Sequence, residues 1–214
     1  ATIDHSFGGM SSILAQMKNR QIKAVLSLDG AMKYQYDAVK GSIFFDINRM
    51  DVPFIHFAQK AIHDSVLKAD QLDPSLNTDF TFFEDLKWSK AYRVQYNDLT
   101  HPYFTTLGLF FNQRDPRQDK PDQDLMPAHR LLANYCYHFL EAYLKENANS
   151  LAWLQETSNK QAEQQKRVNL EIKTALKKPK SFNEFHEIAL AAGYQDLMGI
   201  YKAFKKVQKI NKNM

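Results

Sequence analysis

The chain of 214 residues has a single cysteine, Cys136, and no long apolar run. One cysteine excludes an internal disulfide, and its place in an apolar, helix-like stretch predicts a buried structural thiol rather than a nucleophile. No run approaches the roughly 20 apolar residues that a membrane-spanning helix needs. None of the seven histidines forms a pair with H-E-x-x-H spacing, so we expect no metal site.

What is present is the composition of an ordinary globular domain, with 44% hydrophobic and 24% charged residues. The charge is unevenly spread. From Ser150 onward there are 12 Lys and Arg against 6 Asp and Glu, which leaves a net charge of −2 on the first 149 residues. These lysines could contact nucleic acid or an anionic surface, but a solvated helix face is the simpler interpretation. We therefore expect no nucleic-acid partner.

The stretch from Asp4 to Gly9 has the pattern of a nucleophile elbow. Such an elbow places a serine on a tight strand-to-helix turn between small residues, here Ser6 with Gly8 two residues later. The following residues predict a helix, because apolar side chains recur at Met10, Ile13, Leu14 and Met17. The glycine that normally stands two residues before the serine is replaced by the larger, charged Asp4.

Short strands and helices alternate over the first part of the chain, which predicts parallel pairing and an open α/β sheet. After the serine we expect three strands, at about residues 24–28, 53–58 and 91–96, and at most a strand stub at residues 1–3 before it. Further expected elements are a helix and loop over 60–78, a short helix over 80–88, a charged loop over 114–127 and a long helix over 131–144.

The character of the chain changes near residue 148, and we expect a catalytic part over 1–148 and a helical extension over 149–214. Residues 156–178 are rich in Gln and Lys and predict a helix. Ser181 and Glu184 then have the spacing of a capping box, and Gly193 separates two apolar helical stripes. This end of the chain therefore predicts a helix-turn-helix pair.

The candidate catalytic residues are Ser6, Asp29 and His101. A serine hydroxyl needs a histidine to take its proton and a carboxylate to orient that histidine, and α/β-hydrolases carry them in the order Ser, acid, His. Each of the three lies at the carboxyl end of an expected strand or in the loop after it, where reactive groups gather in such sheets. Asp64 is the alternative acid, and the backbone N–H of Phe7 is the expected oxyanion donor.

Three runs carry a resemblance to a known family: Asp4–Gly9, Leu28–Met32 and Thr100–Phe104. Together they resemble the platelet-activating-factor acetylhydrolase and dienelactone-hydrolase-like branch of the α/β-hydrolases, over roughly residues 1–155. The resemblance implies an α/β-hydrolase fold and calcium-independent hydrolysis of esters with a short or accessible acyl group, without a cofactor. It also implies export, since bacterial relatives of this kind are often exported.

The sequence thus predicts a serine esterase in which Ser6 attacks, His101 is the base and Asp29 orients it. A peptidase or a dienelactone-type hydrolase is an alternative with the same machinery. An alternative of another class is an inactive hydrolase-fold module that binds a partner through its helical tail, and Asp4 favours it.

Few strands are expected before the serine, although α/β-hydrolase sheets normally have several there and draw a second oxyanion N–H from an early loop. We therefore expect these residues to be the carboxyl half of a longer protein, to associate with themselves or aggregate when produced alone, and then to be nearly inactive.

Overall fold

A computed structural model describes residues 1–69, 71, 73, 75, 79–106, 108, 115–156, 166–176, 181–191, 193 and 195–212. The chain divides into two compact units, residues 1–175 and residues 176–214. The first unit contains the sheet and all three candidate catalytic residues, and the second contains two helices.

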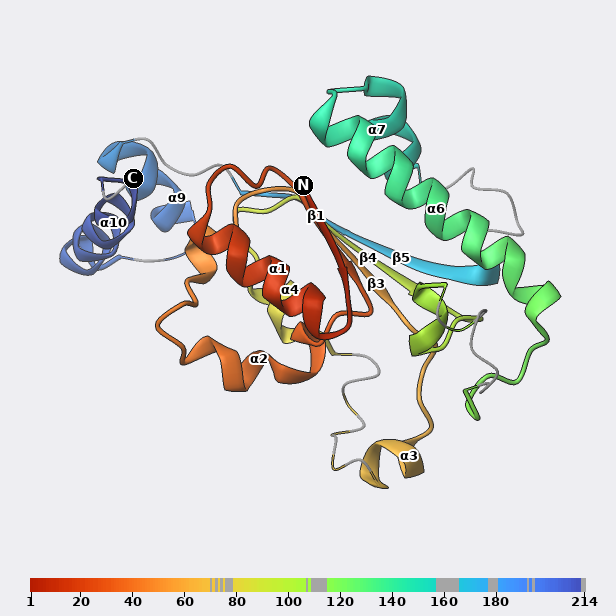
Figure 1. The fold of residues 1–214 in the computed structure, drawn as a ribbon. Coiled ribbons are helices and arrows are strands. Elements are labelled where there is room, and N and C mark those ends of the chain that lie inside the picture. Colours follow the sequence, from red (N-terminus) through yellow and green to blue (C-terminus); the bar gives the residue numbers. More distant parts are fainter. Residues whose placement is uncertain are drawn as a thin grey trace. The chain divides into compact units, whose positions relative to one another are not determined.

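The sheet of the first unit has five strands in the order β1-β2-β3-β4-β5 (Figure 1). Their bounds are β1 Thr2–His5, β2 Val25–Leu28, β3 Phe54–Ala58, β4 Ala91–Tyr96 and β5 Val168–Lys173. The first four strands are parallel, and β5 pairs antiparallel with β4. The predicted α/β class is confirmed, and so are the three strands expected after the serine.

Helices cover both faces of this sheet (Figure 1). One face packs against α1 (Phe7–Lys18), α2 (Met32–Lys40) and α4 (Thr81–Asp85), and the other against α6 (Asp122–Leu144) and α7 (Ala148–Gln155). The connections contain α3 (Asp64–Ala69) and the 3-10 helices η1 (Ile47–Arg49) and η3 (His101–Phe104). Because side chains alternate along a strand, Phe54 joins the α1 core while its neighbour Ile55 joins the α6 core.

The long helix α6 begins earlier than expected. The predicted charged loop up to Pro127 is wrong from Asp122 onward, where α6 starts. Proline in a helix costs a backbone hydrogen bond, but Leu125 and Ala128 are fully buried against the sheet and extend the apolar stripe of the helix. The free energy gained by burying that stripe outweighs the cost of the hydrogen bond that Pro127 cannot form.

The helix expected over 156–178 is wrong over Val168–Lys173, which forms the edge strand β5. Residues 157–165 and 177–178 of that prediction lie outside the described residues. With Leu154 of α7 and Val168 of β5 both buried in the α6 core, the first unit extends to Ala175 instead of ending at residue 148.

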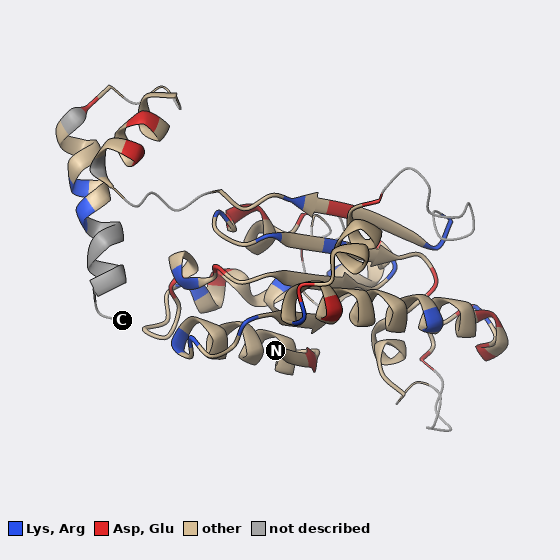
Figure 2. Cartoon of the chain, turned by 90° about the horizontal axis from the view of Figure 1, so that it is seen from above, with Lys and Arg blue, Asp and Glu red and all other residues tan. Residues whose placement is uncertain are grey.

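The second unit contains α9 (Phe182–Ala191) and α10 (Leu197–Lys212), as predicted for a helix-turn-helix pair. The Ser181 hydroxyl accepts a hydrogen bond from the Glu184 N–H at 3.2 Å, which confirms the predicted cap of α9. Lys202 and Lys205 on α10 are exposed, and Figure 2 colours the basic positions of the chain blue. Their exposure fits the interpretation of a solvated basic face.

Each strand contributes one residue to a polar row that crosses the sheet at a single register. The row runs through Asp4, Ser27, His56, Arg93 and Glu171, which are partners in successive strand pairs. Ser27 and His56 are fully buried and hydrogen-bonded to each other, and Arg93 forms an ion pair with Glu171 at 3.2 Å. Polar groups buried in a sheet need such partners.

Candidate active site

The serine elbow is formed between β1 and α1. Ser6 has φ 56° and ψ −123°, a backbone conformation that non-glycine residues rarely adopt. Two backbone hydrogen bonds hold the turn against the end of β2: Ser6 N–H donates to Leu28 C=O at 3.1 Å, and Ala31 N–H donates to Ser6 C=O at 2.8 Å. The elbow therefore sits directly beside the start of the loop that contains Asp29.

The glycines after the serine allow this close approach. A Cβ at Gly9 would lie 2.8 Å from Ser27 Oγ and 2.9 Å from the Gly30 Cα. A Cβ at Gly8 would lie 3.1 Å from the Cβ of Asp4. The elbow thus accommodates Asp4 on its exposed side, and the Asp4 carboxylate accepts a hydrogen bond from the Ser12 hydroxyl.

The structure brings the three candidate catalytic side chains together. The Ser6 hydroxyl lies 3.0 Å from His101 Nε2, and His101 Nδ1 lies 2.6 Å from the Asp29 carboxylate. Because the carboxylate accepts from Nδ1–H, Nε2 is left with its lone pair toward the serine. This is the arrangement in which imidazole takes a proton from a serine hydroxyl.

Asp29 is fixed by its backbone and by β3. It directly follows β2 with φ 42°, a left-handed conformation that aspartate tolerates better than most residues. Its N–H donates to Phe57 C=O at 2.7 Å, and its second carboxylate oxygen accepts from the Gln59 N–H at 3.1 Å. The alternative acid, Asp64, is the exposed first residue of α3, so the carboxylate beside His101 is that of Asp29.

His101 begins η3 and is held through its own peptide groups. Its N–H donates to Gln59 Oε1 at 3.2 Å, and its C=O accepts from His5 Nε2 at 2.9 Å. The His5 and His101 rings also pack with centroids 4.4 Å apart. Neither Gln59 nor His5 is identified by the sequence, although Gln59 follows β3 directly, where most α/β-hydrolases carry their acid.

The candidate oxyanion donor lies at the amino end of α1. Phe7 is the first residue of this 12-residue helix, where a backbone N–H has no acceptor within the helix. The helix dipole adds partial positive charge at the same end. This N–H is the one that the sequence-based hypothesis assigns to the oxyanion formed when Ser6 Oγ attacks a carbonyl carbon.

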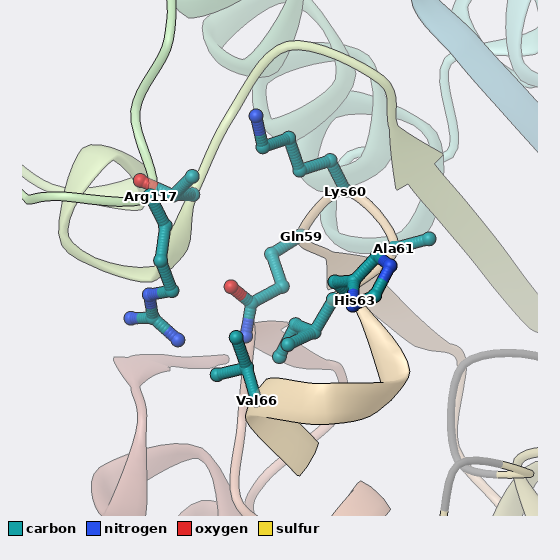
Figure 3. A pocket seen from close by; sticks show the side chains of 8 residues that line it. Gln59, Lys60, Ala61, His63, Val66 and Arg117 are labelled. Atoms are coloured by element: carbon teal, nitrogen blue, oxygen red, sulfur yellow. The ribbon is translucent and has the colours of Figure 1, made fainter.

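A cavity of about 300 Å³ has Gln59 and Thr100 in its wall, and Figure 3 shows the side chains that line it. Gln59 and Thr100 connect it to the site, since Gln59 bonds to both Asp29 and His101 and Thr100 precedes His101. The other residues of its wall are Lys60, Ala61, Ile62, His63, Val66 and Arg117. In Figure 3 the Gln59 side chain lies between those of Arg117 and His63. The wall combines apolar side chains with cationic groups at its margin.

Burial changes the pKa of several groups near the site. Burial lowers the pKa of His56 to about 3 and that of Lys33 to about 8, so His56 is neutral at physiological pH. Burial and the neighbouring His101 lower the pKa of His5. The free thiol of Cys136 is partly buried in the α6 core, and burial raises its pKa to about 12, as suits a structural thiol.

Within the described residues, no group of three or more His, Cys, Asp and Glu side chains is arranged to bind a metal ion. Nor is any described helix both long and apolar enough to cross a membrane. Comparison of the sequence with models of protein families gives no match, and comparison with curated proteins gives none either.

Proposed function

We propose that this chain is a serine hydrolase that cleaves carboxylic esters through an acyl-enzyme. The observation that carries the proposal is the continuous relay from Ser6 through His101 to Asp29, with the serine on a strained elbow. A serine hydroxyl becomes a strong nucleophile only when an oriented base removes its proton. Each of these roles has a residue within hydrogen-bond distance.

In the first half of the reaction, Ser6 Oγ bonds to the ester carbonyl carbon while its proton passes to His101 Nε2. Asp29 accepts the hydrogen bond from Nδ1–H and stabilises the imidazolium. The carbonyl oxygen becomes an oxyanion and accepts from the Phe7 N–H. Collapse of this intermediate breaks the bond to the alcohol, which leaves with the proton from His101.

In the second half, water attacks the acyl-enzyme and loses its proton to His101 Nε2. The new tetrahedral intermediate uses the same oxyanion donor. When it collapses, the bond to Ser6 Oγ breaks and the serine recovers its proton from His101. The products are a carboxylic acid and an alcohol, and the three side chains return to their starting states.

For the substrate, we propose an ester with a short or otherwise accessible acyl group, as the resemblance to the platelet-activating-factor acetylhydrolase branch implies. The cavity beside Gln59 and Thr100, at about 300 Å³, is at the small end of ligand pockets. A peptidase or dienelactone-type hydrolase is the alternative within this chemistry, because the same relay transfers any activated acyl group to water.

The alternative of an inactive module depends on Asp4. This alternative assumes that a charged side chain two residues before the serine disturbs the conformation of the elbow. Ser6 nevertheless has elbow dihedral angles and lies 3.0 Å from His101 Nε2, while the Asp4 carboxylate bonds to Ser12. These contacts favour an active serine.

We further propose that another part of the same protein covers the outer edge of β1 and supplies the second oxyanion N–H. Among the described strands β1 pairs with β2 alone, and Ile3 and Phe7 beside this edge are 50% and 66% exposed. Unpaired edges promote association. Residues 1–214 alone should therefore associate and turn over esters slowly, since one oxyanion donor contributes about 10² to 10³ in kcat. A monodisperse, fully active monomer in size-exclusion chromatography and an esterase assay would contradict this.

An activity-based fluorophosphonate probe tests the serine directly, because it labels only an activated nucleophile. The natural protein at full length should be labelled quickly, and Ser6→Ala should abolish the labelling. Ser27→Ala is the matched control: this serine also bonds to a histidine but is buried, so labelling should persist. Failure of the wild-type protein to label, or labelling that survives Ser6→Ala, would rule out Ser6 as the nucleophile.

A further inference from the structure

The general base of the proposed site is held by both of its peptide groups. The His101 N–H donates to the side-chain oxygen of Gln59 at 3.2 Å, and the His101 C=O faces His5 Nε2 at 2.9 Å. These two side chains come from different strands: His5 is the last residue of β1, and Gln59 directly follows β3. The contacts fix the backbone at the point where the catalytic ring must be placed.

Each of these two residues is also linked to a second member of the triad. Gln59 donates its own backbone N–H to Asp29 at 3.1 Å, and its side-chain amide donates to the Tyr34 hydroxyl at 3.4 Å. His5 precedes Ser6 in the chain. Its ring packs against that of His101 at 4.4 Å between centroids. Gln59 therefore connects the base to the acid, and His5 connects the base to the nucleophile.

We propose that His5 and Gln59 are positioning residues that together hold His101 between Ser6 and Asp29. This inference rests on the proposed function. Neither residue touches the reacting atoms; both hold the backbone of His101, and His5 also packs against its ring. Since the Ser6–His101 and His101–Asp29 contacts are only 3.0 and 2.6 Å long, a small displacement of this backbone breaks them. Misplacement of a catalytic group by about 1 Å can cost 10²-fold in rate.

The contact at His5 also assigns its protonation. A carbonyl oxygen only accepts, so His5 Nε2 carries a proton. Because burial disfavours the charged ring, we assign His5 to the neutral tautomer with hydrogen on Nε2. His101 has the opposite tautomer, with hydrogen on Nδ1 toward the Asp29 carboxylate. Two neighbouring histidines of the same site thus differ in which nitrogen is protonated.

Kinetics on the full-length natural protein test the positioning role. Gln59→Met keeps the length of the side chain but removes the acceptor, and His5→Leu removes the donor. We expect each to lower kcat by roughly 10- to 100-fold. KM should change little in His5→Leu, because His5 is not among the residues that line the cavity. Gln59 lines the cavity, so for Gln59→Met the loss of kcat is the diagnostic quantity. The double variant should be little worse than either single one, since both contacts position the same residue, His101.

Conservative variants separate positioning from packing. Gln59→Glu restores an acceptor at the same distance, and His5→Gln restores a donor in the place of Nε2; each should recover most of the lost kcat. The matched controls are Gln16→Met, which removes a buried side chain that bonds to Arg49 C=O, and His129→Leu on α6. These controls should leave kcat unchanged. Folded Gln59→Met and His5→Leu proteins with wild-type kcat would overturn the proposal.

A second measurement is independent of turnover. Long-range ¹H–¹⁵N correlation of imidazole-labelled protein reports which ring nitrogen of each histidine carries hydrogen. We expect His5 as the Nε2–H tautomer and His101 as the Nδ1–H tautomer, the latter changing in Gln59→Met and His5→Leu. A His5 ring protonated only on Nδ1 would overturn the proposal. Absence of probe labelling in a protein with the expected tautomers would instead count against the hydrolase.

Discussion

One serine–histidine pair, Ser6 and His101, lies just beyond the strand ends, and another, Ser27 and His56, lies within the sheet; the first has the properties of a catalytic pair. Ser6 Oγ is 3.0 Å from His101 Nε2, and Ser27 Oγ is 3.1 Å from His56 Nδ1. The distances are nearly equal. The His101 side chain is 29% exposed, whereas His56 is completely buried in the polar row. A hydrogen bond between serine and histidine is therefore no sign of catalysis by itself.

The difference lies in what surrounds each ring. His101 has a carboxylate at 2.6 Å on its other nitrogen, which supports the positive charge that a general base acquires. His56 packs against Phe80 with ring centroids 4.5 Å apart, and burial lowers the pKa of His56 to about 3. A general base must bind a proton near the working pH, so His56 cannot act as one. Exposure, a carboxylate and the elbow backbone distinguish the first pair.

The largest effect should come from breaking the first pair. Ser6→Ala or His101→Ala should lower kcat for p-nitrophenyl acetate by roughly 10⁴- to 10⁶-fold in the full-length natural protein, because nucleophile and base act as a unit. The double variant should be little slower than either single one. Unchanged turnover in Ser6→Ala would place the nucleophile elsewhere.

The next largest effect should come from the carboxylate that distinguishes the pairs. Asp29→Asn should leave the fold intact but lower kcat by about 10⁴-fold, because an amide stabilises the wrong tautomer of His101. Asp64→Asn is the control, since Asp64 is exposed at the start of α3. The reverse pattern, an unchanged kcat in Asp29→Asn and a lowered kcat in Asp64→Asn, would show that Asp64 is the acid that orients His101.

The first pair could be predicted from the sequence, and the reasons are local. Ser6 lies in a compact turn motif, and Asp29 and His101 each follow an apolar strand that is evident from composition alone. Strand β5 could not be predicted, because Val168–Lys173 lies beside Gln- and Lys-rich residues with helical preference. It becomes a strand by pairing with β4, which lies far away in the sequence.

The residues that hold His101 escaped prediction for a related reason. His5 and His101 are 96 positions apart, and their contact joins a side chain to a backbone oxygen. Spacing in the sequence reveals residues that share one turn or one helix face, but not a side chain that meets a distant peptide group. The same holds for Gln59, whose partners Asp29 and His101 lie in two other loops.

A third prediction concerns the stability that the buried pair gives. His56 has a folded-state pKa of about 3, below the value of 6.5 for an unfolded chain. Between these values only the unfolded state binds the proton, so the free energy of unfolding should fall by up to about 1.4 kcal/mol for each pH unit below 6.5. Urea unfolding of wild type and His56→Asn between pH 7 and 4 measures this. The variant should be less stable at pH 7 but less sensitive to acid, and parallel pH curves would contradict the assignment.

The smallest effect should come from removing the serine of the buried pair. Ser27→Ala keeps the Cβ but leaves His56 Nδ1 buried without its partner, which should cost about 1 to 3 kcal/mol of unfolding free energy. Ser11→Ala is the control, because the exposed Ser11 bonds only to a carbonyl of its own helix, and its cost should stay below about 0.5 kcal/mol. Since Ser27 serves packing beneath the elbow, kcat of the folded Ser27→Ala protein should equal that of wild type. A loss of kcat comparable to that in Ser6→Ala would mean that the two pairs are coupled in the reaction and that the distinction between them is wrong.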